Sequence, residues 1–176
     1  AAAAPDVACL QGSLDFYNSH SNWLARCFTI EYNTWFKAVL PALASNNQIV
    51  PLGGTTLFFR RTILEDLGAW DAFNVTEDCD LGVRLSRRGY RCEILRSTTS
   101  EEANNLARPW IKQRSRWIKG YYITYFTHMR DIKQLVQDLG WTRFWHFQML
   151  FLPTLILLPI APVFWAMWGV FFGLFS

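Results

Sequence analysis

Short apolar runs, most of them ended by glycine or proline, divide the first 130 residues into pieces of strand length and helix length. Residues 7–12 form a short, mostly apolar run that ends in glycine and predict a buried strand. Residues 23–43 predict an amphipathic helix that ends near Pro41, because proline breaks the helical hydrogen-bond pattern. The positions that recur at helical spacing in this segment are Trp23, Cys27, Ile30 and Thr34.

The pattern continues as alternating strands and helices. Residues 49–59 predict a glycine-rich bend that feeds a strand, and residues 61–67 predict a short helix stopped by Gly68. A helix over 81–88, closed by Gly89, then precedes a strand over 91–95. A polar loop is expected over 97–107, and Pro109 suits the first turn of a helix over 110–128. This alternation predicts an α/β domain.

The last third of the chain has a different pattern. Residues 131–143 are mildly amphipathic, and Trp141 near their end and Trp145 just after them are expected for a segment at a membrane–water interface. Residues 147–176 contain no charged residue and no histidine, and as a helix they would reach about 45 Å against a hydrocarbon core of about 30 Å. A buried core helix is the alternative, but such helices seldom run this far without a charge. The span contains three prolines that could kink it or make it the start of a hairpin: Pro153, Pro159 and Pro162.

Composition narrows the function classes. The net charge of +3 and the apolar tail argue against a nucleic-acid partner. The four cysteines are widely spaced, which argues against a zinc site or a disulfide scaffold and fits a reduced, cytosol-facing domain. The basic residues all precede the apolar tail, so the globular part is expected to face the cytosol.

Three carboxylates lie within the five residues 76–80. Thr76 is a suitable N-cap and acids in a first turn suit the helix dipole, so a capped helix start is the simpler interpretation. The Asp78–Cys79–Asp80 spacing is typical of a divalent-metal site, but side chains two apart on a helix point about 200° away from each other. Asp78 alone, with Gly82 expected to leave open space on its face, could act as a general base toward a hydroxyl.

A second cluster, residues 113–117, lies on the basic helix. Gln113 and Trp117 share a helix face, and Arg116 lies about 100° from Trp117. A guanidinium suits phosphate oxygens and an indole face suits the apolar face of a sugar. A solvated cationic face against lipid headgroups is the alternative, although it gives no reason for these offsets.

Taken together in order, these motifs resemble the membrane-integrated family 2 glycosyltransferases, the group that includes bacterial cellulose and hyaluronan synthases. The shared elements are Gln11-Gly12, Gly53-Gly54-Thr55, Gly68-x-Trp70-Asp71, Thr76-Glu77-Asp78, Gln113-Arg114-Ser115-Arg116-Trp117 and the apolar span after them. The resemblance implies a GT-A-like (Rossmann-like) domain, a nucleotide-sugar donor such as a UDP-sugar, and transfer with inversion to a glycan acceptor. It also implies Mg²⁺ or Mn²⁺, with ligands expected upstream of this chain.

The resemblance assigns roles to individual residues. Asp78 would be the general base and Glu77 would shape the site. Arg116, with Arg114, would stabilise the diphosphate, while Trp117 and Gln113 would contact the acceptor sugar. Gly53, Gly54 and Thr55 match a segment near the acceptor, although Leu52-Gly53 stands where cellulose synthases have Phe-Cys.

The expected organisation therefore has three parts. Residues 1–130 would be the acceptor-side half of the catalytic domain, 131–146 an amphipathic interfacial segment and 147–176 a transmembrane segment, at a bacterial inner membrane. The alternative is a non-catalytic, membrane-anchored module that keeps the motifs but serves as a partner-binding subunit.

Overall fold

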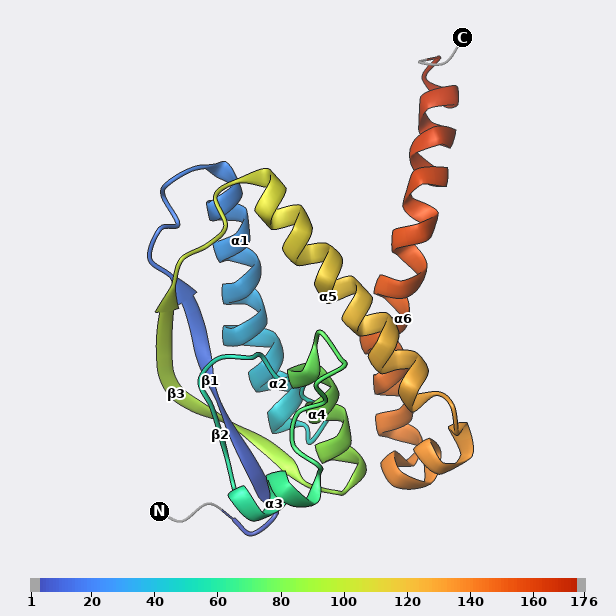
Figure 1. Cartoon of the computed structure of the whole chain (residues 1–176). Coiled ribbons are helices and arrows are strands. Elements are labelled where there is room, and N and C mark those ends of the chain that lie inside the picture. The colour runs from blue at the N-terminus through green and yellow to red at the C-terminus, as the bar shows by residue number, and fades with distance from the viewer. Residues whose placement is uncertain (1–3, 174–176) are drawn as a thin grey trace.

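The computed structural model describes residues 4–173 and shows a mixed α/β protein with a small sheet and a long C-terminal helix (Figure 1). The sheet has three strands in the order β2-β1-β3. Strand β1 (Val7–Phe16) lies parallel to β3 (Arg91–Glu101) and antiparallel to β2 (Leu57–Phe59). The predicted α/β class is confirmed at this level.

The helices differ from the sequence expectation in where they begin and end. Helix α1 (Trp23–Thr34) does not stop at Pro41 but passes through a π-helical segment η1 (Trp35–Val39) into α2 (Leu40–Ser45). The backbone N–H of Leu40 reaches back five residues to the carbonyl of Trp35, and this wider turn places Pro41, which has no N–H, in the first turn of α2. The prediction that the helix ends near Pro41 was therefore wrong.

The residues that recur at helical spacing in α1 lie on its exposed face. Trp23 is 76% exposed and Ile30 is 61% exposed, whereas Ala25, Phe28 and Thr29 are buried against the sheet side of the molecule. The residues at helical spacing thus mark the outer face, because apolar residues occur on both faces of α1.

Two strands are longer than the apolar runs suggested. Strand β3 extends to Glu101 through the expected polar loop, because its second half pairs with the second half of β1, from Ser13 to Phe16. The ladder shifts register between Gln11 and Ser13. β3 is an edge strand whose second half is largely exposed, so its side chains there can be polar. The polar composition therefore did not predict a strand.

Helix α4 (Glu77–Arg87) begins four residues earlier than predicted and lies between two hydrophobic cores. Its Leu81 and Leu85 belong to the core formed with β1, α1 and α3 (Arg61–Asp66). Its Cys79 and Val83 belong to a second core, formed with helices α5 (Ala107–His128) and α6 (Ile132–Phe171). Helix α4 therefore connects the sheet to the C-terminal helices.

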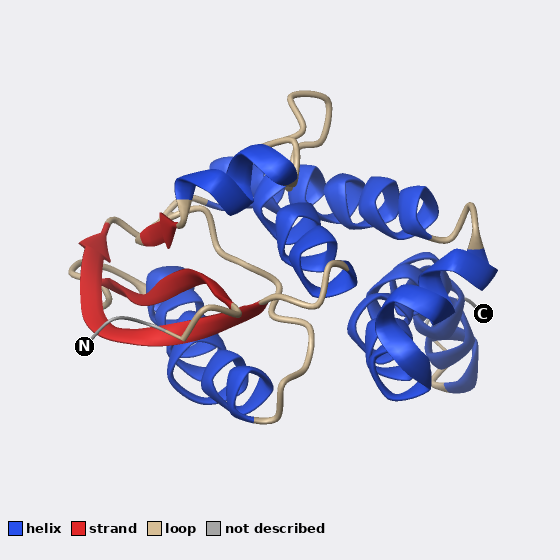
Figure 2. Ribbon diagram, turned by 90° about the horizontal axis from the view of Figure 1, so that it is seen from below, coloured by secondary structure: helices blue, strands red, loops and turns tan. Residues whose placement is uncertain are grey.

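Helix α6 stands farthest from the sheet, with α5 running between, and is seen nearly end-on in Figure 2. It is long and apolar enough to cross a membrane. Its backbone is non-helical at Gly140, where φ is 71°, and it continues as a helix through Pro153, Pro159 and Pro162. Within the described part the tail is one helix, and the break at Gly140 lies inside the predicted interfacial segment 131–146.

Candidate functional site

A cavity of about 790 Å³ opens where α1 and η1, the bend at 51–55, the start of α4, helix α5 and the middle of α6 meet. Most of the predicted site residues line it: Gly53, Gly54, Thr55, Glu77, Asp78, Gln113, Arg114 and Trp117. Arg116 does not line it. The structure thus brings the two motifs together in one space, although 35 residues separate them.

Asp78 points into this cavity from the first turn of α4. Its Oδ1 accepts a hydrogen bond from the backbone N–H of Cys79 at 2.7 Å, and a Cβ on Gly54 would lie 3.2 Å from its Oδ2. Burial raises the pKa of Asp78 to about 6, the backbone N–H groups of Cys79 and Gly54 oppose that rise, and nearby Glu77 adds to it. A carboxyl group with this pKa is ionised at neutral pH yet basic enough to accept a proton.

The surroundings of Asp78 differ from the expectation in two details. Gly82 leaves no open space, because a Cβ there would lie 2.2 Å from the carbonyl oxygen of Val50. Thr76 occupies the N-cap position, but its side chain makes no capping bond and its hydroxyl lies 3.3 Å from Asn74 Oδ1 instead. Both residues serve close packing: Gly82 admits the 50–52 segment, and Thr76 packs on Gly120 of α5.

The two aspartates of the 78–80 motif point to different partners. Asp78 faces the cavity, whereas Asp80 is buried and contacts Arg84 of α4 and His128 of α5. Both lie within helix α4, so their side chains diverge as helical geometry requires. Among residues 4–173, no three His, Cys, Asp or Glu side chains come together as metal ligands. The described residues therefore do not fit the divalent cation, and no step of the reaction is assigned to one held here.

The glycine-rich bend is held by Gln11, a buried residue of β1. Its Oε1 accepts a hydrogen bond from the backbone N–H of Gly53 at 2.8 Å, and its Nε2 donates to the carbonyl of Thr55 at 2.9 Å. A Cβ on Gly53 would lie 2.7 Å from the ring of Phe36. Only glycine fits between the ring and the bend, so Gly53 is placed by packing as much as by substrate access.

Trp117 forms the aromatic wall of the cavity. Its ring stacks on Phe28 with 6.3 Å between centroids and tilts against Tyr32 at 6.0 Å. The guanidinium of Arg114 lies 4.9 Å from the Trp117 ring centroid and forms a bidentate ion pair with Glu31 of α1. Arg114 is therefore committed to Glu31 and the aromatic rings.

The other two predicted site residues of the motif, Gln113 and Arg116, differ in their access to the cavity. Gln113 lines the cavity, and its Oε1 accepts a hydrogen bond from Asn104 at 2.9 Å. Arg116 is exposed and has no hydrogen-bond or ion-pair partner within the described residues. Its charge is available to a ligand on that outer face.

Several residues of the site were not predicted from the sequence. Gln11 appeared only as part of a motif, while Glu31, Tyr32 and Tyr121 had no local signal, since each acts through partners distant in sequence. The middle of α6 also contributes an apolar wall, formed by Met149, Leu150, Phe151 and Thr154.

The family described as "Glycosyl transferase family group 2" matches residues 1–176, which is the whole chain. The chain belongs to this family. The family-level resemblance drawn from the motifs is thereby confirmed.

The chain is also similar to individual glycosyltransferases, at modest sequence identity. It is 34% identical over 74 residues to the probable glycosyltransferase YdaM of Bacillus subtilis, covering 42% of this chain and 18% of the relative. It is 31% identical over 130 residues to the beta-monoglucosyldiacylglycerol synthase of Trichormus variabilis, covering 73% of this chain and 26% of that relative. It is 28% identical over 118 residues to the poly-beta-1,6-N-acetyl-D-glucosamine synthase of Staphylococcus aureus, covering 66% of this chain and 28% of that relative. The chain thus spans about a quarter of the length of these relatives or less.

Proposed function

We propose that this chain supplies the acceptor side of an inverting glycosyltransferase. The enzyme would move a sugar from a nucleotide-diphosphate sugar, such as a UDP-sugar, to a growing polysaccharide or other glycan acceptor. The observation that carries the proposal is the shared cavity, in which Asp78, with a pKa of about 6, faces the same space as Gln113 and Trp117. A base, a stacking platform and a polar contact are what an incoming sugar hydroxyl requires.

Asp78 acts as the general base in this mechanism. The acceptor hydroxyl oxygen forms a bond to the anomeric carbon of the donor while the bond from that carbon to the diphosphate oxygen breaks. The hydroxyl proton passes to the Asp78 carboxylate, and the nucleoside diphosphate leaves on the opposite face, which inverts the configuration. Glu77 lines the cavity beside Asp78 and its charge helps keep the proton affinity of Asp78 high.

The acceptor sugar stacks on Trp117. The position of that ring is fixed by Phe28, Tyr32 and the Arg114–Glu31 pair, so Arg114 is a positioning residue in this proposal and not a phosphate ligand. Gln113 contributes its amide to the sugar hydroxyls, and the bare backbone at Gly53-Gly54-Thr55 allows the acceptor to approach closely.

Arg116 stabilises the diphosphate. Its guanidinium is exposed and free of ion pairs among residues 4–173, and it lies one residue from Trp117. Arg116 lies outside the cavity, so this role requires the diphosphate to extend to the outer face of α5. Charge that develops on the diphosphate there would be stabilised by the unpaired guanidinium, and Arg116→Ala should raise the barrier by about 2–4 kcal/mol. The matched control is Lys112→Ala, another exposed cation of α5. A transfer rate within about twofold of the parent would restrict Arg116 to contacts with lipid or solvent.

Helix α6 anchors the enzyme in a bacterial inner membrane, with the globular part on the cytosolic side. Supporting this, α6 is long, apolar and largely unburied, and the basic residues precede it in sequence. The apolar wall of the cavity comes from α6 itself, through Met149 and Leu150. That wall favours an acceptor that approaches from the membrane side, and it makes a lipid-linked acceptor the second candidate.

Incubation of membranes carrying the full-length protein with radiolabelled nucleotide sugars tests the proposal. We expect labelled glycan from the parent protein, and no product from Asp78→Asn despite normal membrane insertion. Asp66→Asn is the control, because Asp66 is exposed and lies 3.9 Å from Arg88. Label that extracts into organic solvent identifies the lipid-linked acceptor, and label in insoluble polymer identifies the polysaccharide.

Two results would contradict the proposal. Near-normal turnover by Asp78→Asn would remove the base assignment. Absence of transfer by the parent protein across a panel of nucleotide sugars would favour the alternative, a non-catalytic membrane-anchored module that binds a partner.

A further inference from the structure

A chain of polar side chains crosses the largely apolar junction between α4, α5 and α6. His128, at the end of α5, is only 4% exposed, and its Nε2 lies 3.0 Å from Asp80 Oδ1 on α4. Its Nδ1 lies 3.1 Å from Arg87 Nη1, also on α4. Arg87 in turn binds Asp138 of α6, with Nε 2.8 Å and Nη2 2.7 Å from the same carboxylate oxygen. We call Asp80, His128, Arg87 and Asp138 the interhelix network.

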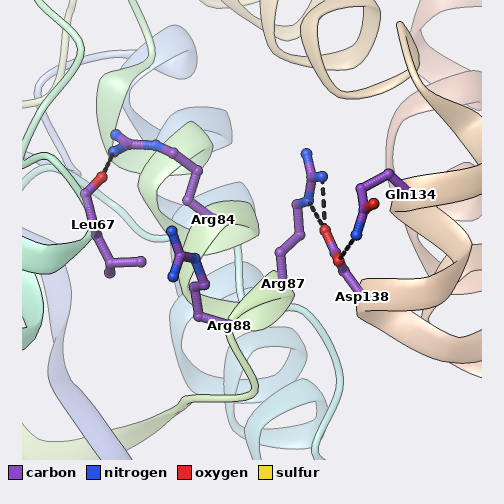
Figure 3. A pocket seen from close by; sticks show the side chains of 6 residues that line it. All are labelled: Leu67, Arg84, Arg87, Arg88, Gln134 and Asp138. Atoms are coloured by element: carbon purple, nitrogen blue, oxygen red, sulfur yellow. Dashed lines mark hydrogen bonds and ion pairs between the residues drawn. The ribbon is translucent and has the colours of Figure 1, made fainter.

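Figure 3 shows the outer end of the interhelix network, where Arg87 reaches across to Asp138. Asp138 is held from its own helix by Gln134, whose Nε2 donates to Asp138 Oδ1 at 2.7 Å. At the inner end, Asp80 also binds Arg84 at 2.8 Å, and Arg84 donates to the carbonyl of Leu67. Each carboxylate is therefore held by at least two donors.

The network determines which nitrogen of His128 carries the hydrogen. A guanidinium group can only donate hydrogen bonds, so Nδ1 of His128 must accept from Arg87 through its lone pair. The hydrogen then lies on Nε2, where it donates to the Asp80 carboxylate. The geometry thus specifies a neutral imidazole with hydrogen on Nε2.

The network holds α4 at both ends. Asp80 lies in the first turn and Arg87 in the last, seven residues or about two turns apart, so they lie on the same face of the helix. The apolar contacts of α4 are not directional, whereas hydrogen bonds require defined distances and angles. A side chain about 6 Å from the helix axis moves about 2 Å when the helix rotates by about 20°. Asp78, on the opposite face from Asp80, would move by that amount.

We propose that Asp80, His128 and Arg87 are positioning residues of the transfer reaction, because they fix the rotation of α4 and thereby hold the Asp78 carboxylate beside Gly54. This inference rests on the proposed role of Asp78 as the general base. A displacement of the base by about 1 Å can lower the rate by up to about a hundredfold while leaving substrate binding largely intact. The network should therefore affect kcat more than KM.

Two variants of His128 separate the hydrogen bonds from the packing. In membranes carrying the full-length transferase, His128→Leu removes both hydrogen bonds with a side chain of similar bulk. His128→Gln keeps an N–H group for Asp80 and an acceptor oxygen for Arg87. We expect kcat to fall about tenfold or more in His128→Leu, with donor and acceptor KM within about twofold of the parent, and to recover largely in His128→Gln.

Arg87 and its neighbour Arg88 supply a second matched pair. Arg87→Met breaks the network, whereas Arg88→Met removes an exposed cation that reaches Asp66 only at 3.9 Å. We expect only the Arg87 variant to lose kcat. This pair keeps the proposal testable if His128→Leu does not accumulate in membranes, as does measurement of the His128 tautomer in the unmodified protein by nitrogen-15 NMR.

Several results would overturn the proposal. These are a kcat for His128→Leu or Arg87→Met within about twofold of the parent, a His128→Gln variant as impaired as His128→Leu, or a hydrogen found on Nδ1 of neutral His128. Failure of the base assignment is distinguishable, because it appears as turnover by Asp78→Asn. An inactive Asp78→Asn beside an unimpaired His128→Leu overturns the positioning role alone.

Discussion

The hydroxyl of Tyr122 on α5 donates a 2.7 Å hydrogen bond to the backbone carbonyl of Leu155 on α6. Pro159 lies four residues after Leu155 and has no N–H, so that carbonyl lacks its usual helical donor. Tyr122 supplies the missing donor. The contact explains how α6 continues as a helix through a proline while staying fixed to α5.

Removing this hydroxyl should weaken the packing of α5 on α6. We expect Tyr122→Phe to lower the free energy of unfolding by about 1–2 kcal/mol, because a carbonyl away from water loses its partner. In a Pro159→Ala background the helical N–H returns, so the same substitution should cost clearly less. Reversible unfolding in detergent, analysed as a double-mutant cycle, measures the difference. Equal losses in both backgrounds would show that Tyr122 does not compensate for the proline.

The raised pKa of Asp78 predicts the pH dependence of transfer. Only the carboxylate can accept the acceptor proton, so kcat/KM should rise about tenfold per pH unit up to about pH 6 and then level off. Initial rates across pH 5–8, with insertion and folding checked at each pH, measure the profile. A profile with no inflection near the pKa of about 6 would contradict the assignment of Asp78 as the base.

The raised pKa of Asp78 affects folding stability in the opposite direction: activity rises with pH, whereas stability falls. The pKa of Asp78 is raised from 3.8 to about 6, so the folded protein binds this proton more tightly than the unfolded chain does. The resulting stabilisation is present below pH 3.8 and is lost as pH rises to about 6. At pH 7, Asp78→Asn should therefore have a higher free energy of unfolding than the parent protein, and this difference should shrink as the pH falls toward 4. An unchanged difference across this range would show that burial does not penalise the charge.

Arg114 and Glu31 should act as one unit. Lysine cannot reproduce a bidentate pair that also stacks on aromatic rings, so Arg114→Lys should lower kcat/KM about tenfold, mainly through a higher KM for the acceptor. Glu31→Gln should have a similar effect, and the double variant should be little worse than either single one. Acceptor titrations at saturating donor measure this. Additive losses would mean that the two residues act separately, and Lys112→Ala is the unpaired cationic control.

Gln11 should prove essential to the shape of the bend at 53–55. Gln11→Leu leaves the Gly53 N–H and the Thr55 carbonyl without this partner, which should cost about 2–6 kcal/mol of folding free energy, at about 1–3 kcal/mol for each group. Gln137→Leu, at an exposed position of α6, is the matched control and should change stability little. Chemical unfolding in detergent measures both. A stable Gln11→Leu variant with an unchanged acceptor KM would show that the bend holds itself.

Local pattern predicted the parts of the structure that depend on neighbours in sequence. The helix stop at Gly68, Pro109 in the first turn of α5 and the divergence of Asp78 from Asp80 all follow from short-range backbone geometry. The long apolar helix at the C-terminal end also follows from composition, which gives its length and hydropathy.

Pattern failed where distant partners decide the outcome. The buried face of α1 is chosen by Phe16 and Trp117, which stack on Phe28, and nothing within α1 itself distinguishes that face from the one with Trp23. The partner of Arg114 is Glu31, 83 residues away. Gly82 was expected to leave open space beside Asp78, but the backbone of residues 50–52 packs against it. The local sequence around Gly82 gives no sign of that distant segment. The assignment of residues 1–130, 131–146 and 147–176 to three functional parts remains a prediction.

The position of α4 between two cores has a practical consequence for preparing this enzyme. Cys79 and Val83 pack among Phe144, Phe147 and Phe151, so a shortened soluble version that ends before the tail would strip one side of the helix that carries Asp78. Loss of turnover after such trimming, or in a harsh detergent, could then result from displacement of Asp78 as well as from loss of the membrane anchor. Substitutions at Phe144 or Phe147 would be scored as catalytic defects although neither residue lines the cavity.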